Sequence, residues 1–162
     1  MLDSKFIVAT DLRKLVLDGY PAHNVLGCDL RESFIHLGFE LYSDKDTCKI
    51  SFFTDNVLEL PLEKDIAIST VPNNKVQSLI ELKGRVSHIY AGALFHLFDE
   101  EIQRAIAVRL ALLLKEGSGG IIFGRHQGNK HSGIFYDGTE RHVDQSAFSC
   151  KLDSYLCMYV YS

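Results

Sequence analysis

The sequence predicts an α/β fold, with a mostly parallel sheet that carries helices on both of its faces. Short apolar stretches rich in β-forming residues alternate with stretches whose apolar residues recur at helical spacing. The clearest junction follows Val86–Tyr90, where a short strand runs into the small residues Ala91-Gly92-Ala93 and on toward a long amphipathic helix. Such alternation is typical of βαβ units, so the carboxyl ends of the strands are expected to share one edge, where open α/β sheets bind ligands.

The first part of the chain is expected to contain three strands and two helices. Thr10 or Asp11 is suited to cap the first helix, and Gly19 is suited to end it. The second helix has Phe34, Leu37, Gly38 and Leu41 at a spacing near 3.6. The strands are expected at 6–9, 25–29 and 49–55, and the helices at 11–18 and 32–42.

The second part of the chain is expected to add two more parallel strands around the longest helix. A short helix is expected at 76–82, a fourth strand at 86–90 and a fifth at 120–124. Asp99 is suited to cap the long helix at 100–115. The polar segment 125–150 is expected to be a loop that covers or lines a site, and the apolar, aromatic segment 152–161 a last strand at an edge.

Length and composition are those of an ordinary globular domain, expected to span residues 1–162. The net charge is −4 and no basic patch is present, which argues against nucleic acid as a partner. No apolar run reaches about 18 residues and the N-terminus lacks a signal-peptide pattern, so we expect neither a membrane span nor secretion. The four cysteines include no C-x-x-C pair, so a cytoplasmic protein with reduced thiols and no metal site is expected.

Two acids stand where expected strands end. Asp29 ends the second strand, where an acid in a nucleotide-binding α/β fold accepts hydrogen bonds from ribose hydroxyls. Asp55 ends the third strand, where a polar residue can meet an adenine amino group. The alternative is structural: Asp29 caps the following helix, and Asp55 caps a turn.

Two histidines follow the expected carboxyl ends of the fourth and fifth strands. His96 and His126 could face one pocket as proton donors or acceptors near neutral pH, together with His142. Arg125 could stabilise a developing negative charge there, or it could pair with a surface acid. There is no H-E-x-x-H pair, no G-x-S-x-G elbow and no Walker loop, so neither a zinc protease nor a serine hydrolase nor a P-loop is indicated.

A nucleotide site also requires a glycine-rich turn after the first strand, so that the ligand can approach the backbone. If the first strand is 6–9, this turn should lie between Ala9 and Leu12. The sequence there contains no glycine and leaves almost no loop. This absence argues for weak cofactor binding or none.

Several blocks in the right order resemble class I S-adenosylmethionine-dependent methyltransferases of fungal secondary metabolism. The resemblance runs from about Asp11 to Phe148. The blocks are Asp11-Leu-Arg-Lys-Leu-Val-Leu-Asp-Gly19, Leu26-Gly-Cys-Asp-Leu-Arg-Glu-Ser-Phe-Ile35, Tyr90-Ala-Gly-Ala-Leu-Phe-His-Leu-Phe98, Gly124-Arg-His-Gln-Gly128 and Arg141-His142.

The resemblance implies a Rossmann-like sheet and a particular assignment of residues. Asp29 matches the ribose acid, Asp55-Asn56 the adenine edge, and Ala91-Gly92 the position beside the methionine part of the cofactor. His96 is placed near the acceptor. Apart from the resemblance, Tyr90 at the end of the fourth strand and Phe95 are expected to bind the substrate.

The chain also departs from the pattern of these methyltransferases. Family members carry a glycine-rich loop, roughly D-x-G-C-x-x-G-Q, before the D-L-R-K-L block, which is expected to be reduced here to Val8-Ala-Thr10. The N-terminal region that usually helps to cover the substrate is expected to be missing, which would expose apolar surface and favour a homodimer.

Three functions are consistent with these observations, each with a small molecule as the ligand. The first is a tailoring enzyme of natural-product metabolism that no longer uses S-adenosylmethionine and catalyses an isomerisation, cyclisation or rearrangement by positioning and acid–base help. The second is a methyltransferase that does use S-adenosylmethionine, despite its unusual loop. The third is a non-catalytic relative that binds a ligand or a partner enzyme.

Overall fold

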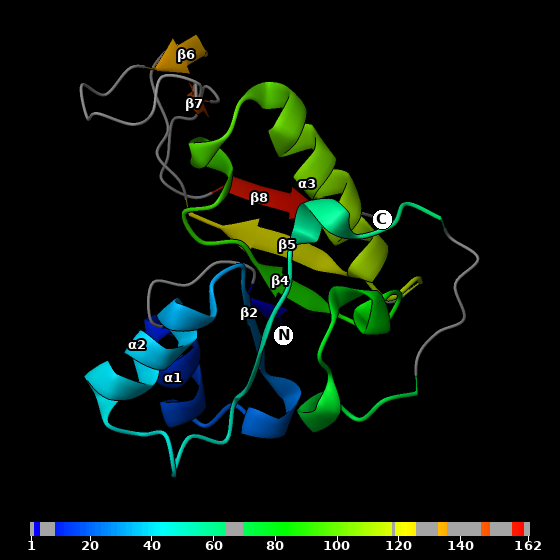
Figure 1. Cartoon of the computed structure of the whole chain (residues 1–162). Coiled ribbons are helices and arrows are strands. Elements are labelled where there is room, and N and C mark those ends of the chain that lie inside the picture. The colour runs from blue at the N-terminus through cyan, green and yellow to red at the C-terminus, as the bar shows by residue number, and fades with distance from the viewer. Residues whose placement is uncertain are drawn as a thin grey trace.

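The computed structural model describes residues 2–3, 9–63, 70–117, 119–125, 133–135, 147–149 and 157–160. Strands and helices alternate along most of this length (Figure 1). The elements are β1 (Leu2–Asp3), α1 (Thr10–Leu17), β2 (Leu26–Asp29), α2 (Glu32–Tyr42), β3 (Ser51–Thr54), β4 (His88–Tyr90), α3 (Glu100–Leu113), β5 (Ile121–Gly124), β6 (Gly133–Phe135), β7 (Ala147–Ser149) and β8 (Cys157–Val160).

The central sheet has the strand order β3-β2-β1-β4-β5-β8. The strands β1 to β5 are parallel to one another, and β8 pairs with β5 in the antiparallel direction at the edge. The chain therefore builds outward from β1 to β3 and then returns to place β4 on the other side of β1. The mostly parallel sheet and the last strand at an edge are both confirmed.

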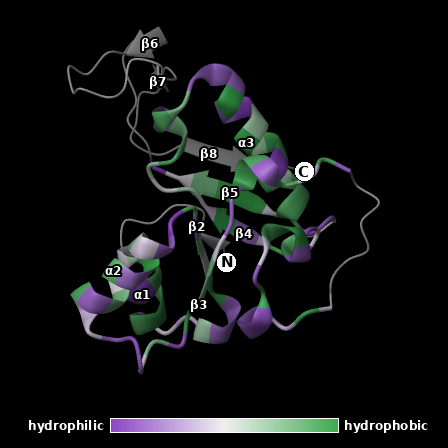
Figure 2. Ribbon diagram, viewed as in Figure 1, coloured by the Kyte–Doolittle hydropathy of each residue, from purple (hydrophilic) through white to green (hydrophobic). Residues whose placement is uncertain are grey.

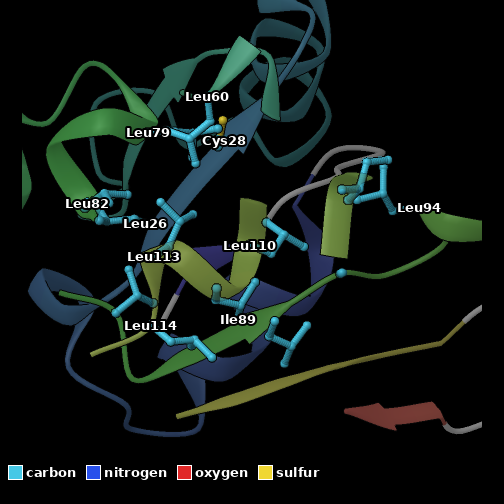
Figure 3. Close-up of a cluster of buried hydrophobic side chains, with 14 of the residues drawn as sticks. Leu26, Cys28, Leu60, Leu79, Leu82, Ile89, Leu94, Leu110, Leu113 and Leu114 are labelled. Carbon is cyan, nitrogen blue, oxygen red and sulfur yellow. The ribbon is translucent and has the colours of Figure 1, made fainter. Parts of the chain in front are cut away.

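Apolar side chains pack on both faces of this sheet. Adjacent residues of one strand point to opposite faces, and Val25 and Leu26 accordingly belong to two separate apolar clusters. The larger cluster contains the inner side of α3, including Ile106, Leu110 and Leu113 (Figure 3). The smaller cluster contains Leu12 of α1. Helices thus cover both faces, and on α3 hydrophilic residues alternate with the hydrophobic ones (Figure 2).

Most of the predicted helix boundaries are confirmed. α2 begins and ends at the predicted residues, and α3 begins after Asp99, whose Oδ1 accepts a hydrogen bond from the Ile102 N–H at 2.8 Å. The apolar spacing of α2 does not mark a single buried face, however. Leu37 and Leu41 are 47% and 62% exposed, because α2 packs through Gly38 and through Phe39, whose ring meets Phe52 edge to face at 5.4 Å.

Three predictions about local structure need correction. The first described strand is Leu2–Asp3, and Ala9 has a left-handed backbone with φ of 53°, so it does not end a strand at 6–9. The predicted strand residues 6–8 lie outside the described part of the chain. The short helix expected at 76–82 is a 3₁₀ turn at Leu79–Leu82. Segment 125–150 is more than a loop, because β6 and β7 form a separate antiparallel pair within it.

A partly buried ion pair joins α1 to the segment after α2. The guanidinium of Arg13 donates from Nε to Asp44 Oδ2 at 2.7 Å and from Nη2 to Asp44 Oδ1 at 2.9 Å. It also lies 4.7 Å from the centroid of the Tyr42 ring and 5.6 Å from those of Phe39 and Phe52. Hydrogen bonding from Arg13 lowers the pKa of the Asp44 carboxyl below its ordinary value.

This pair predicts a loss of stability in acid. The pKa of Asp44 is lower in the folded than in the unfolded chain. The stabilisation that the ionised carboxylate gives the folded state is therefore fully present above the unfolded pKa of about 3.9. The contribution is lost as the pH falls through the lower folded value. In urea unfolding between pH 2 and 7, the free energy of unfolding should fall less toward acid pH for Asp44→Asn than for wild type. The exposed Asp18→Asn variant is the control, and an equal change in both variants would contradict the assignment.

Among the described residues, no helix combines the length and apolar character needed to cross a membrane.

Candidate functional site

The carboxyl ends of the five parallel strands meet at one edge of the sheet. β1 ends at Asp3, which is the Cα partner of Tyr90 at the end of β4 and of Gly27 in β2. The direction of chain building reverses between β1 and β4, so this pair marks the topological switch point. Ligands of open α/β sheets bind outside the strand ends at such a point. The candidate site is therefore the edge around the ends of β1, β2 and β4.

Asp29 ends β2 and is only 5% exposed. Its Oδ1 accepts a hydrogen bond from the Arg31 N–H at 2.8 Å, and its backbone carbonyl accepts one from the Asp55 N–H at 3.2 Å. Asp29 does not cap α2 as the structural alternative predicts, because the cap position is Arg31, whose own side chain makes no capping hydrogen bond. One carboxylate oxygen shapes the turn into α2, while the residue also stands beside the switch point.

The carboxylate of Asp55 is engaged with its own chain. Oδ1 accepts a hydrogen bond from the Asn56 N–H at 2.7 Å. Oδ2 accepts from the Ser78 hydroxyl at 2.9 Å and from the Leu79 N–H at 2.7 Å, so Asp55 holds the start of the Leu79–Leu82 turn. Asn56 is likewise occupied, because its Oδ1 accepts from the Leu58 N–H and its Nδ2 donates to Glu59. The contacts of these two side chains match the structural alternative.

Tyr90 reaches from β4 across the switch point. Its hydroxyl donates a hydrogen bond to Asp11 Oδ2, in the first turn of α1, at 3.0 Å. Its ring lies against the buried Gly92, where an added Cβ would stand 2.8 Å from Cε1, Cζ and the hydroxyl oxygen. The other ring neighbour is Phe123 of β5, with centroids 5.4 Å apart. Tyr90 therefore bridges the end of β4 and the beginning of α1.

The turn after β4 is fixed to the end of β5 by the backbone. The Ala91 N–H donates to the Phe123 carbonyl at 2.8 Å, and the Ala93 N–H donates to the Arg125 carbonyl at 2.6 Å. Ala91 is 2% exposed. Arg125 itself is exposed at the end of β5, so the structure places it at the predicted edge. These bonds bring residues 91–93 to the candidate site through rigid strands.

The remaining predicted residues are divided between the turn after β4 and the part of the chain not described. His96 is half-buried in the short turn Phe95–Leu97, and Phe95 is 5% exposed within the larger apolar cluster. Phe95 is thus a core residue in this structure. His126 and His142 lie outside the described residues. Within the described ranges, no group of three or more His, Cys, Asp or Glu side chains is arranged to hold a metal ion.

β1 ends earlier in the sequence than the strand predicted at 6–9, and residues 4–8 lie outside the described part of the chain. Because β1 ends at Asp3 and α1 begins at Thr10, residues 4–9 separate them. Aligned on Asp11, the pattern D-x-G-C-x-x-G-Q covers Asp3 to Thr10 at full length, and its two glycines are replaced by Lys5 and Ala9. Ala9 keeps the left-handed backbone that a glycine adopts without strain.

By sequence position, the segment is thus as long as the pattern of these methyltransferases, but it lacks both of the pattern's glycines. The alignment also identifies two residues that sequence reasoning missed, Asp3 and Asp11. The signal for Asp3 was the spacing of the pattern itself, counted back from the D-L-R-K-L block. The prediction that Thr10 or Asp11 caps the first helix is wrong, because the cap position is Ala9. Asp11 instead contacts Tyr90, and this contact depends on the strand order.

Comparison with known proteins relates the chain to fungal methyltransferases, although no family model matches the sequence. It is 34% identical over 129 residues to the O-methyltransferase atr3 of Stereocaulon alpinum, covering 80% of this chain and 33% of that protein. It is 33% identical over 124 residues to the asnovolin E/chermesin D methyltransferase nvfJ of Aspergillus novofumigatus, covering 76% and 40%. The chain thus spans between a third and two fifths of the length of these two relatives.

Solved structures share the fold at low sequence identity. A structure concerned with the conversion of a disulfide bond into a thioacetal group during echinomycin biosynthesis aligns with a TM-score of 0.57 at 19% identity, covering 80% of this chain and 43% of that one. The CurJ carbon methyltransferase aligns with a TM-score of 0.54 at 13% identity, covering 79% and 29%. The chain therefore has the Rossmann-like fold of class I methyltransferases and resembles, over most of its length, the methyltransferases of fungal secondary metabolism.

Proposed function

We propose that this chain forms the cofactor-binding part of an S-adenosylmethionine-dependent methyltransferase that acts on an oxygen of a fungal small molecule. The observation that carries the proposal is the similarity to O-methyltransferases across four fifths of the chain. None of the relatives reported above is named an isomerase or a cyclase, so a rearrangement without the cofactor has no comparable support.

Among the described residues, Asp29 and the turn at Ala91-Gly92 support a place for the cofactor, whereas the Asp55 and Asn56 side chains are engaged with their own chain. Asp29 is a buried acid at the end of β2, next to the switch point, where ribose hydroxyls can donate to its carboxylate. The turn at Ala91-Gly92 is small and is held rigidly by the end of β5. The bound cofactor would supply an electrophilic methyl group, and the chain's own residues would position it and exclude water.

The acid or base in this proposal is His96. It lies half-buried in the turn that follows the Ala91-Gly92 segment. An imidazole titrates near neutral pH and can take the proton of an acceptor hydroxyl. Arg125 is exposed at the same edge and is suited to steer an anionic acceptor.

The test is calorimetric binding of S-adenosylhomocysteine, which needs no methyl acceptor. We expect Asp29→Asn to weaken binding by roughly 10- to 100-fold, because hydrogen bonds to a charged acceptor contribute about 1.5–3 kcal/mol. Asparagine keeps the Oδ1 acceptor for the Arg31 N–H, so the turn into α2 should persist.

The matched control is Asp46→Asn, an exposed acid in the segment between α2 and β3. It should bind like wild type. Equal affinity of wild type and Asp29→Asn for the ligand would refute the proposed cofactor site.

A further inference from the structure

Tyr90 lies against Gly92 at the end of β4. In the resemblance to methyltransferases, Ala91-Gly92 stands beside the methionine part of the cofactor. The structure shows that the outer half of the Tyr90 ring covers Gly92, since an added Cβ there would stand 2.8 Å from three of its atoms. A ligand that occupied the space where a Cβ of Gly92 would stand and this ring position therefore exclude each other.

The ring is held in place by contacts at both of its ends. The hydroxyl donates to Asp11 Oδ2 at 3.0 Å, and the ring packs against Phe123 at 5.4 Å between centroids. The bond to Asp11 links β4 to α1 across the switch point, over 79 residues of sequence. It is exposed, so its net contribution is modest and it can open at little cost.

We propose that Tyr90 and Asp11 form a gate at the switch point, closed in this structure and open when the cofactor is bound. This proposal rests on the proposed function. In the closed state the Tyr90 ring covers Gly92, and in the open state the hydroxyl leaves Asp11 and the ring swings off the glycine. Tyr90 thereby sets how tightly the site binds, because only the open fraction of molecules accepts the ligand.

If Tyr90 is a gate, loss of its hydroxyl should strengthen ligand binding, whereas loss of a hydroxyl that contacts the ligand should weaken it. Tyr90→Phe keeps the ring and removes only the bond that holds the gate closed. We expect it to bind S-adenosylhomocysteine about 3- to 10-fold more tightly than wild type, the factor that corresponds to one net hydrogen bond. If Tyr90 instead binds the ligand through its hydroxyl, the same variant should bind more weakly.

The chain offers a closely matched control. Tyr42 also donates or accepts a hydrogen bond with α1, at Thr10 Oγ1 over 2.6 Å, but it comes from the end of α2 rather than from a strand end at the site. Tyr42→Phe therefore removes the hydrogen bond between a tyrosine hydroxyl and Thr10, which is the residue next to Asp11 in α1. We expect its affinity for S-adenosylhomocysteine to equal that of wild type.

A second variant opens the gate without altering Tyr90 or Asp11. Alanine at Gly92 must displace the end of the Tyr90 ring, which is the flexible end of the side chain. In the ligand-free protein, Tyr90→Phe should then change the free energy of unfolding much less in a Gly92→Ala background than in wild type. An equal change in both backgrounds would overturn the claim that the ring on Gly92 is the closed position.

The binding experiment uses calorimetry with S-adenosylhomocysteine on wild type, Tyr90→Phe and Tyr42→Phe. Tighter binding by Tyr90→Phe alone supports the gate, as does binding by Tyr90→Phe when wild type shows none. Unchanged or weaker binding by Tyr90→Phe, with wild type binding well, overturns the gate and leaves the proposed function intact. Absence of binding by all three proteins overturns both.

Discussion

Replacement of Gly124 by alanine is expected to lower the free energy of unfolding by about 3 kcal/mol and the melting temperature by roughly 10 °C. A Cβ at this position would stand 2.2 Å from the carbonyl oxygen of Ala91 and 2.7 Å from its carbon. These are backbone atoms, so no side-chain rotation can relieve the clash. The end of β5 must instead separate from the turn that follows β4.

The control is Gly117→Ala, in the turn between α3 and β5. An added Cβ there has nothing within 4 Å, and only the positive φ of 68° is unfavourable. We expect Gly117→Ala to lower the free energy of unfolding by about 1 kcal/mol, because alanine is strained in that backbone conformation. Thermal melts of both variants test the difference, and a Gly124→Ala variant as stable as Gly117→Ala would show that the strands can part without cost.

The Arg13→Met variant is expected to lose about 2–3 kcal/mol of folding free energy. It leaves the Asp44 carboxylate without its two hydrogen bonds from the guanidinium, and it removes the cation from among three aromatic rings. The loss is smaller than for a fully buried pair, because the Asp44 side chain is 21% exposed and can be hydrated in part.

The neighbouring residue provides the matched control. Lys14 pairs with Asp18 four residues along the same helix, but both side chains are more than half exposed. Lys14→Met should lower the free energy of unfolding by no more than about 0.5 kcal/mol. Arg13→Lys should fall between the two, since it keeps the charge without the fork of two donors. Urea unfolding at pH 7 measures the free energy of unfolding of all three variants. Similar losses for Arg13→Met and Lys14→Met would show that the partly buried pair stabilises the fold no more than the exposed one.

The sequence was most informative where local chemistry decides the structure. The bounds of α2 and the cap at Asp99 follow from helical spacing and from a side chain that satisfies its own helix terminus. Asp29 was identified as a candidate because an acid that ends a strand stands at the ligand-binding edge. These inferences need only a few neighbouring residues.

The sequence was least informative where distant segments meet. An apolar run at 6–9 resembled a strand, whereas Leu2–Asp3 is too short to show any periodicity. The contact between Tyr90 and Asp11 depends on β4 lying beside β1, which no local pattern encodes. The exposure of Leu37 and Leu41 depends in the same way on how α2 packs against β3.

The position of β1 between β2 and β4 has a consequence for how the site comes into being during folding. β1 pairs with β2 across a short stretch of chain, but its pairing of Leu2 with Ile89 closes a loop that includes β2, β3 and the turns up to β4. Contacts of such long sequence separation form slowly, because the entropy of loop closure must be overcome before they add stability. The switch point therefore forms only when β4 docks, and a nascent chain lacks the candidate site until that step.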